Sequence, residues 1–227
     1  MFSRSHPPLR PLAGRSPAAL ESEHRLWGKA MTQAQVKFPT FEDYLSYSNA
    51  MNLEGFYELI DGELVELPPE SEQNNWFALN LRDYLIRLIR RRLVRVHACE
   101  VQVPVLHPKD AANRFPDLVV LRQEHLELTQ RRLTITLDMP PPRLIAEVVS
   151  PGKTNQDRDY INKRAQYAAI GVPEYWLIDP VAQTVMVLRL EGETYQEIGV
   201  FDHQSAIASV EFAGLELTVA QLFESEI

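Results

Sequence analysis

The sequence is poor in several features that would point to a particular class of protein. Only one of its 227 residues, Cys99, is a cysteine, which excludes an intrachain disulfide and a cysteine-rich zinc site. A lone thiol fits a reducing compartment, so we expect a cytoplasmic protein. No apolar run approaches the roughly 18 residues of a membrane-spanning helix. The histidines are scattered without the spacing of zinc ligands: His97, His107, His125 and His203.

Positive charge is also scarce. Lysine and arginine number 23 against 31 aspartate and glutamate residues, which gives a net charge of −8. The charge of the whole protein would therefore not attract nucleic acid, although a local basic patch can do so. The most basic stretch is Arg87, Arg90, Arg91, Arg92 and Arg95. Its ordinary interpretation is a solvated face near a helix C-terminus, where the helix dipole favours cations; phosphate binding is the alternative.

The first thirty residues differ in composition from the rest of the chain. Residues 1–30 contain four prolines and few large apolar side chains, and they follow no helical or strand period. We expect a disordered tail at 1–30 and a single domain at 31–227, because the chain is 45% hydrophobic and long enough to bury a core. The tail lacks the apolar stretch of a secretory signal. Met31 precedes the first patterned segment and is an alternative translation start.

Periodicity, turn residues and capping residues predict a mixture of helices and strands from residue 38 onward. The predicted elements are, in chain order, a helix from Thr40 to Ser48 that opens with a capping box to Asp43, a hairpin around Asp61-Gly62, a long amphipathic helix over 71–93, a strand over 94–106, a strand around Asp117, an unassigned polar segment over 122–142, a strand around Glu147, a helix over 155–170 ended by Gly171, a strand over 174–179, and a hairpin around Glu191-Gly192. The strands before and after the 155–170 helix predict a parallel crossover.

Two carboxylates interrupt strands that are otherwise apolar. Asp117 lies in Arg-Phe-Pro-Asp-Leu-Val-Val-Leu, and Glu147 lies in Arg-Leu-Ile-Ala-Glu-Val-Val-Ser. An ionised carboxylate in such surroundings costs several kcal/mol unless a cation or hydrogen bonds compensate it, and two of them in neighbouring strands repel each other. A metal ion between them would remove both costs. Lys163, on the next predicted helix, can bring a positive charge to the same end of the sheet.

This order of elements and acids resembles the core of the PD-(D/E)XK nucleases. More narrowly, the chain resembles a large family of restriction-endonuclease-like bacterial proteins. The motifs that carry the resemblance are Tyr57-Glu58-Leu-Ile-Asp61-Gly62-Glu63-Leu, Phe115-Pro116-Asp117-Leu-Val-Val, Glu147-Val-Val-Ser150-Pro151, Asp157-Arg-Asp159-Tyr-Ile-Asn-Lys163 and Gly171-Val-Pro-Glu174-Tyr175-Trp176-Leu-Ile-Asp179-Pro180. They extend over most of the patterned chain, and their common order makes the resemblance specific.

The resemblance implies an α/β fold with a restriction-endonuclease-like core. The core would be a mixed central sheet flanked by helices in the order αβββαβ, with an added N-terminal hairpin and an added C-terminal hairpin. In the superfamily pattern a lysine stands two positions after the second acid, but Val149 occupies that position here. The family resemblance assigns the role to Lys163 instead. Because Asp159 lies four residues before it, a surface ion pair is the alternative for this lysine.

The implied activity is that of a divalent-metal-dependent endonuclease acting on DNA phosphodiester bonds. Oxygen ligands suit Mg²⁺ or Mn²⁺, and we expect Asp117, Glu147 and the backbone carbonyl of Val148 to hold the ion. Lys163 would orient the attacking water or offset charge in the transition state. Glu58 is a candidate third catalytic carboxylate, although its place in a hairpin also fits a cross-strand partner.

Two other functions remain open at this point. The protein could bind nucleic acid on the same fold with little catalysis, and a test for metal-dependent activity separates this function from a nuclease. It could instead hydrolyse another phosphate ester, and a substrate screen separates this function from a nuclease. We also expect a homodimer, because enzymes that cut both strands of a duplex usually present two sites related by a two-fold axis. Candidate apolar contact residues, all of which could instead pack within the domain, are Phe56, Leu64, Val65, Leu67, Phe212, Leu215, Leu217, Leu222 and Phe223.

Overall fold

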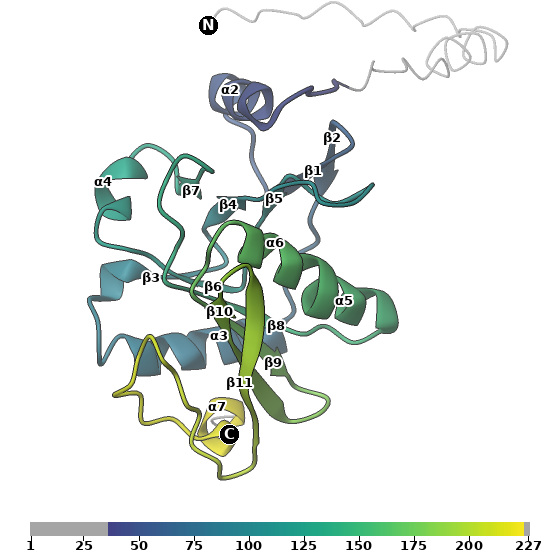
Figure 1. The fold of residues 1–227 in the computed structure, drawn as a ribbon. Coiled ribbons are helices and arrows are strands. Elements are labelled where there is room, and N and C mark those ends of the chain that lie inside the picture. Colours follow the sequence, from purple (N-terminus) through teal and green to yellow (C-terminus); the bar gives the residue numbers. More distant parts are fainter. Residues whose placement is uncertain (1–35, 225–227) are drawn as a thin grey trace, which may run out of the picture. The chain divides into compact units, whose positions relative to one another are not determined.

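A computed structural model describes residues 36–224 of the chain. The tail predicted for residues 1–30 lies outside these residues, as does the predicted start of the domain at residue 31. The elements (Figure 1) are, in chain order, α2 (Phe41–Met51), β1 (Tyr57–Ile60), β2 (Glu63–Glu66), α3 (Glu72–Leu85), the 3-10 turn η1 (Arg91–Leu93), β3 (Val94–Val96), β4 (Glu100–Gln102), β5 (Asn113–Arg114), β6 (Leu118–Val120), α4 (His125–Leu128), β7 (Thr134–Ile135), β8 (Leu144–Val148), α5 (Lys153–Asp157), the π-helical segment η2 (Arg158–Lys163), α6 (Arg164–Ala169), β9 (Glu174–Asp179), β10 (Thr184–Glu191), β11 (Thr194–Asp202) and α7 (Val219–Phe223).

The centre of the domain is a mixed six-stranded sheet. Its strand order is β11-β10-β9-β8-β6-β3, so β11 and β3 are the two edges. All neighbouring strands run antiparallel except β8 and β9, which run parallel and are joined through α5, η2 and α6. The predicted mixed sheet and parallel crossover are therefore confirmed.

Alternation along the strands buries both faces of this sheet against helices. On β6 and β8, the side chains of Leu118, Val120 and Ala146 share one apolar cluster with residues of α3 and α7. Their sequence neighbours Val119 and Ile145 face the opposite cluster, to which α6 contributes its one large buried aromatic side chain. The period of two along a strand thus assigns odd-numbered residues of β6 and β8 to the face covered by α6.

Two smaller sheets and α2 complete the described part of the chain. The hairpin β1–β2 turns through Asp61 and Gly62, whose φ angles of 51° and 80° are those of the predicted type I′ turn. β4 lies between β5 and β7 in a three-stranded sheet. Asn113 of β5 accepts the Leu59 N–H at 2.7 Å, which ties the hairpin to this sheet. At α2, the Thr40 side chain accepts the Asp43 N–H as predicted, although the helix continues past Ser48 to Met51.

Two predicted elements differ from the structure. The helix predicted over 71–93 ends at Leu85 and is followed by tight turns. Apolar residues after its end, such as Ile89, still pack against the core although their backbone is not helical. Periodicity reports only which residues face the core, so it does not distinguish a continuing helix from such turns. The single strand over 94–106 is two strands, β3 and β4, in different sheets. His97 separates them with a left-handed backbone, φ 49°, that turns the chain away from the first sheet.

The remaining predicted elements are present. The helix over 155–170 is the continuous run α5–η2–α6, and Gly171 follows it with φ 81°. The previously unassigned segment 122–142 contains α4 and β7. Cys99 lies in the core, 1% exposed. Among the described residues, no helix combines the length and the apolar character that crossing a membrane requires.

Candidate active site

Three side chains that carry chemistry meet at the end of three neighbouring strands. β6 pairs Leu118 with Val96 of β3 and with Ala146 of β8. One position further along, Asp117 therefore stands between His97 and Glu147, and the His97 N–H donates to the Asp117 backbone carbonyl at 3.0 Å. Asp117 and Glu147 both belong to the odd-numbered set that faces α6. The sheet register thus brings the two predicted acids side by side.

Asp117 is buried, with 7% exposure, and both of its carboxylate oxygens have neighbours. Oδ2 accepts the Val148 N–H at 2.6 Å, and Oδ1 lies 3.4 Å from Nδ1 of His97. The backbone N–H of Val148 therefore faces Asp117. Because the N–H and C=O of one residue in an extended strand serve the same side, the Val148 carbonyl is directed toward the Asp117 side of β8 as well.

Glu147 is 1% exposed and is held at both oxygens. Its Oε1 accepts a hydrogen bond from the Tyr167 hydroxyl at 2.6 Å, and its Oε2 lies 2.8 Å from Nζ of Lys163. Burial raises the pKa of Glu147 to about 7, against the opposing effect of the Lys163 charge, while the charges of Asp117 and Asp159 raise it further. A carboxylate with so high a pKa is one that a bound cation would stabilise.

Lys163 points at this site from the end of η2. Its Nζ lies 2.8 Å from Glu147 and 2.9 Å from Oδ1 of Asp159, four residues earlier. Burial by itself lowers the pKa of Lys163, but Glu147 and Asp159 together keep it above its ordinary value. The Asp159 pair does form, but it is buried rather than exposed, and the same ammonium also contacts Glu147. The π-helical turn that aims Lys163 is a feature often found at functional sites.

Glu58 is engaged elsewhere in the structure. Both of its carboxylate oxygens accept from Arg114 Nη1, at 3.1 and 3.0 Å, and the Glu58 side chain is 12% exposed. Arg114 also donates through Nε to Gln166 of α6 at 2.9 Å. The partner is thus an arginine on β5, whereas the residue opposite Glu58 in its own hairpin is Val65. A catalytic role for Glu58 stays a prediction.

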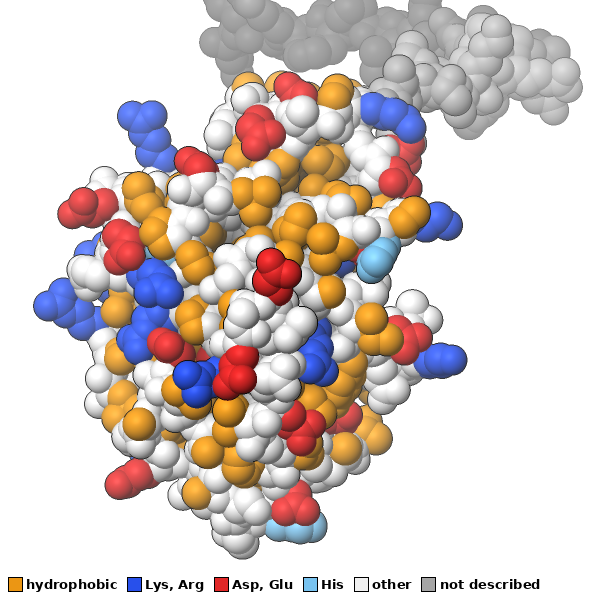
Figure 2. All heavy atoms as spheres, in the orientation of Figure 1, with side chains coloured by type: hydrophobic (Ala, Val, Ile, Leu, Met, Phe, Trp, Pro, Cys, Tyr) orange, Lys and Arg blue, Asp and Glu red, His pale blue; other side chains and the backbone are white. Residues whose placement is uncertain are grey.

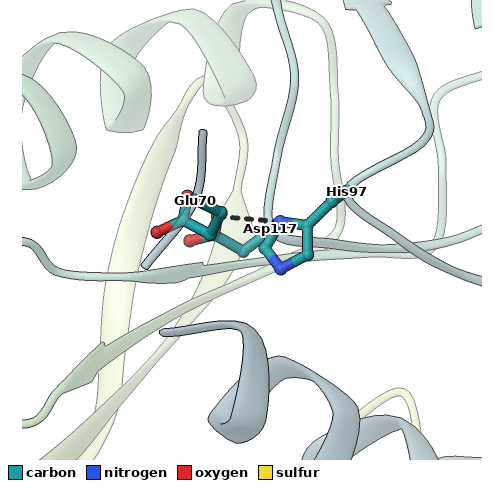
Figure 3. Close-up of side chains that lie close together, drawn as sticks. All are labelled: Glu70, His97 and Asp117. Carbon is teal, nitrogen blue, oxygen red and sulfur yellow. Dashed lines mark ion pairs between the residues drawn. The ribbon is translucent and has the colours of Figure 1, made fainter. Parts of the chain in front are cut away.

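Two residues that sequence reasoning did not select lie beside Asp117. Glu70, His97 and Asp117 each offer one ligand atom, and these atoms lie within 4.8 Å of one another (Figure 3). Glu70 is exposed, whereas Asp117 is buried. Burial by itself lowers the pKa of His97, but its hydrogen bond to Asp117 and the charge of that residue keep the pKa above its ordinary value. No local spacing could have revealed this group, since strand register places His97 beside Asp117 and the loop between β2 and α3 brings Glu70 to them.

A cleft opens beside these side chains. It has a volume of about 290 Å³, and Asp117, His97 and Glu70 line it together with Phe56 and Phe115. The two phenyl rings are 4.8 Å apart at their centroids. Of the two acids, Asp117 therefore borders this cleft on the side of the first hairpin, whereas Glu147 does not line it.

Comparisons with known proteins agree with this arrangement. One structure that is similar to this chain is that of "a putative nuclease belonging to DUF820" from Anabaena variabilis. It matches with a TM-score of 0.56 at 20% identity over 77% of this chain and 94% of the other, which supports the fold. No curated protein matches. Residues 41–220 match the model of the Uma2 family, described as "Putative restriction endonuclease". Since the match spans most of the sequence, the chain belongs to the Uma2 family of restriction-endonuclease-like proteins.

Proposed function

We propose that this protein is a divalent-metal-dependent endonuclease that hydrolyses DNA phosphodiester bonds. The observation that carries the proposal is that the register of β6 and β8 places Asp117, one residue before β6, beside Glu147 of β8, with Nζ of Lys163 at 2.8 Å from Glu147. Family membership supports nuclease chemistry. The metal, the substrate and the roles of the individual residues are our inference.

The donor set fits a hard divalent cation. Asp117 and Glu147 supply carboxylate oxygens, and the Val148 carbonyl is directed to the same side, which is the chemistry that Mg²⁺ and Mn²⁺ prefer. The raised pKa of Glu147 marks a buried carboxylate whose charge is under-compensated in the protein alone. When bound, such an ion would lower the pKa of a coordinated water and polarise a phosphoryl oxygen. The imidazole of His97 adds a nitrogen donor beside Asp117, which suits Mn²⁺ better than Mg²⁺.

The residues around the acids fix their geometry. Tyr167 holds one oxygen of Glu147, and the Val148 N–H holds one oxygen of Asp117. Asp159 and Glu147 hold the Lys163 ammonium at the site and together leave one of its three N–H donors available. We infer that Lys163 uses this donor to orient the attacking water or to offset negative charge on the phosphate. Glu58 would act as a third carboxylate only if the substrate competes for Arg114.

A plasmid-nicking assay with Mg²⁺, Mn²⁺ or EDTA tests this proposal. We expect nicking with either metal and none in EDTA. Asp117→Ala and Glu147→Ala should abolish activity, and Lys163→Met should cut the rate sharply while leaving metal affinity, measured by calorimetry, nearly unchanged. The exposed Lys153 lies on the same helical run, so Lys153→Met is the matched control. Absence of metal binding to the wild type would refute the proposal. Nucleic-acid binding without nicking would indicate a catalytically weak binding protein, and activity only on other phosphate esters would indicate a different hydrolase.

We also propose a homodimer that forms through the first hairpin. Phe56 and Val65 are 44% and 45% exposed. The C-terminal residues considered for the dimer contact pack within the domain core instead. Phe212, Leu215, Leu217 and Leu222 are buried there, and Phe223 packs on the same apolar cluster. Gel filtration with light scattering should give a dimer mass, and Phe56→Ser with Val65→Ser should shift it to the monomer. A monomer mass for the wild type would exclude the dimer.

A further inference from the structure

Four arginines that the proposed reaction does not use converge on a hollow at the edge of the central sheet. Arg82 comes from α3, Arg91 and Arg92 from η1, and Arg95 from β3. With Leu79, Val94, Val96 and Ala98 they line a space of about 360 Å³ along the outer edge strand. We call this space the arginine hollow. Figure 2 shows Lys and Arg side chains gathered on the left flank of the molecule, over the segment that joins α3 to β3 in Figure 1.

The helix dipole does not account for these cations. α3 ends at Leu85, and Arg82 is the one basic residue in its last turn. Arg91, Arg92 and Arg95 follow several residues later, outside the range over which a helix C-terminus favours positive charge. The dipole therefore does not account for Arg91, Arg92 and Arg95, although Arg91 and Arg92 are exposed, as the solvated-face interpretation expects.

The charges in the hollow are largely uncompensated within the described residues. Arg82 pairs with Asp83 at 2.7 Å, but over residues 36–224 no ion pair forms at Arg91, Arg92 or Arg95. The Nε atom of Arg95 is buried without a hydrogen-bond partner in that range. Burial lowers the pKa of Arg95; Cys99 opposes this effect, and the Arg92 charge adds to it. Because an unsatisfied buried donor costs free energy, the hollow favours an anionic ligand.

The hollow adjoins the candidate active site through three consecutive residues. Val96 and Ala98 line the arginine hollow, while His97 between them lines the cleft that contains Asp117. The two spaces therefore lie on either side of one short stretch of backbone. Because β3 is an edge strand, a linear polyanion whose scissile group lies at Asp117 can reach the hollow by passing around this edge.

We propose that the arginine hollow binds the phosphodiester backbone of the nucleic-acid substrate next to the cleavage position. This inference rests on the proposed function, and it adds where the substrate runs and how it is held. Guanidinium groups present donors in a planar fork that matches phosphate oxygens. Contacts to phosphates carry no sequence information directly, so the hollow contributes affinity that is independent of sequence and sensitive to salt.

The salt dependence of binding tests this proposal. Fluorescence anisotropy would follow a labelled DNA duplex in EDTA, where cleavage does not interfere, between about 50 and 200 mM NaCl. Each phosphate contact contributes about −0.9 to the slope of log K against log salt. The exposed pair Arg91→Gln/Arg92→Gln should therefore reduce the magnitude of the slope by about 1.8. Arg131→Gln/Arg189→Gln removes the same net charge from exposed positions outside the hollow and should leave the slope unchanged. Thermal melts check that both variants fold.

The outcomes separate this inference from the proposed function. Equal slopes for the two double variants would overturn the inference even if the plasmid is nicked. A reduced slope without any nicking would support the hollow as a phosphate site while the nuclease proposal fails. Binding of anionic phospholipid vesicles that depends on Arg91 and Arg92, with no such dependence for DNA, would assign the hollow to a membrane surface and would also overturn the inference.

Discussion

Removing the Lys163 ammonium should destabilise the fold, independently of any catalytic effect. In the structure Nζ lies 2.8 Å from Glu147 and 2.9 Å from Asp159, and all three residues are buried, at 7%, 1% and 1% exposure. Lys163→Met would leave two buried carboxylates without this cation. Breaking a buried pair by deleting one partner costs about 3–5 kcal/mol. For a domain of this size each kcal/mol lowers Tm by about 2–4 °C, so we expect a loss of roughly 6–20 °C.

Urea unfolding followed by circular dichroism, in EDTA at pH 8, measures this loss. Lys37→Met is the matched control, because Lys37 lies 2.9 Å from Glu63 but its side chain is 67% exposed; a pair of that kind contributes little to stability. The double variant Lys163→Met/Glu147→Gln should recover part of this loss, since it removes one of the two buried carboxylates that lack a cation.

The pH dependence of the variant provides a second check. Without Lys163 the buried carboxylates ionise at higher pH than in the unfolded chain, so the folded variant binds more protons and its deficit should shrink as the pH falls from 8 to 5. If Lys163→Met and the Lys37→Met control have the same free energy of unfolding at every pH, the buried ion-pair argument is refuted.

Three further predictions concern the same region and the first hairpin. Asp117→Ala should lower the free energy of unfolding by about 1–3 kcal/mol because the Val148 N–H loses its acceptor, whereas Asp117→Asn keeps an acceptor oxygen and should lose much less stability. Urea titration measures both variants, and equal losses would contradict the hydrogen-bond argument. The pKa of Glu147 in the folded protein, about 7, exceeds its ordinary value of 4.5. The contribution of Glu147 to stability is therefore complete below pH 4.5 and declines by about 3 kcal/mol as the pH rises through 7. The difference in unfolding free energy between wild type and Glu147→Gln should show this decline with pH, and a difference that is constant with pH would refute it. Gly62→Ala should cost about 1–3 kcal/mol in urea unfolding, because Gly62 has φ +80° and an added Cβ would lie 3.1 Å from the Phe38 carbonyl oxygen; an unchanged midpoint would show that the turn relaxes.

The sequence was sufficient wherever local chemistry decides the structure. Asp61-Gly62 specifies the hairpin because its turn requires positive φ at both positions. Thr40 and Asp43 specify the start of α2 because the side chain satisfies an N–H that the helix leaves free. The apolar strands around Asp117 and Glu147 predicted that both acids would be buried, which the structure confirms at 7% and 1% exposure.

Tertiary structure alone decided which of these groups meet. His97 and Glu70 lie beside Asp117 through strand register and the path of a loop, neither of which leaves a local spacing in the sequence. Glu58 pairs with Arg114, 56 residues away, and the apolar C-terminal residues pack into their own core. Periodicity predicted one helix to residue 93 because it reports which residues face the core but not whether the backbone between them stays helical. The physical reason is common to all of these cases: propensity and capping act over a few residues, whereas register and burial are set by contacts between segments far apart in the chain.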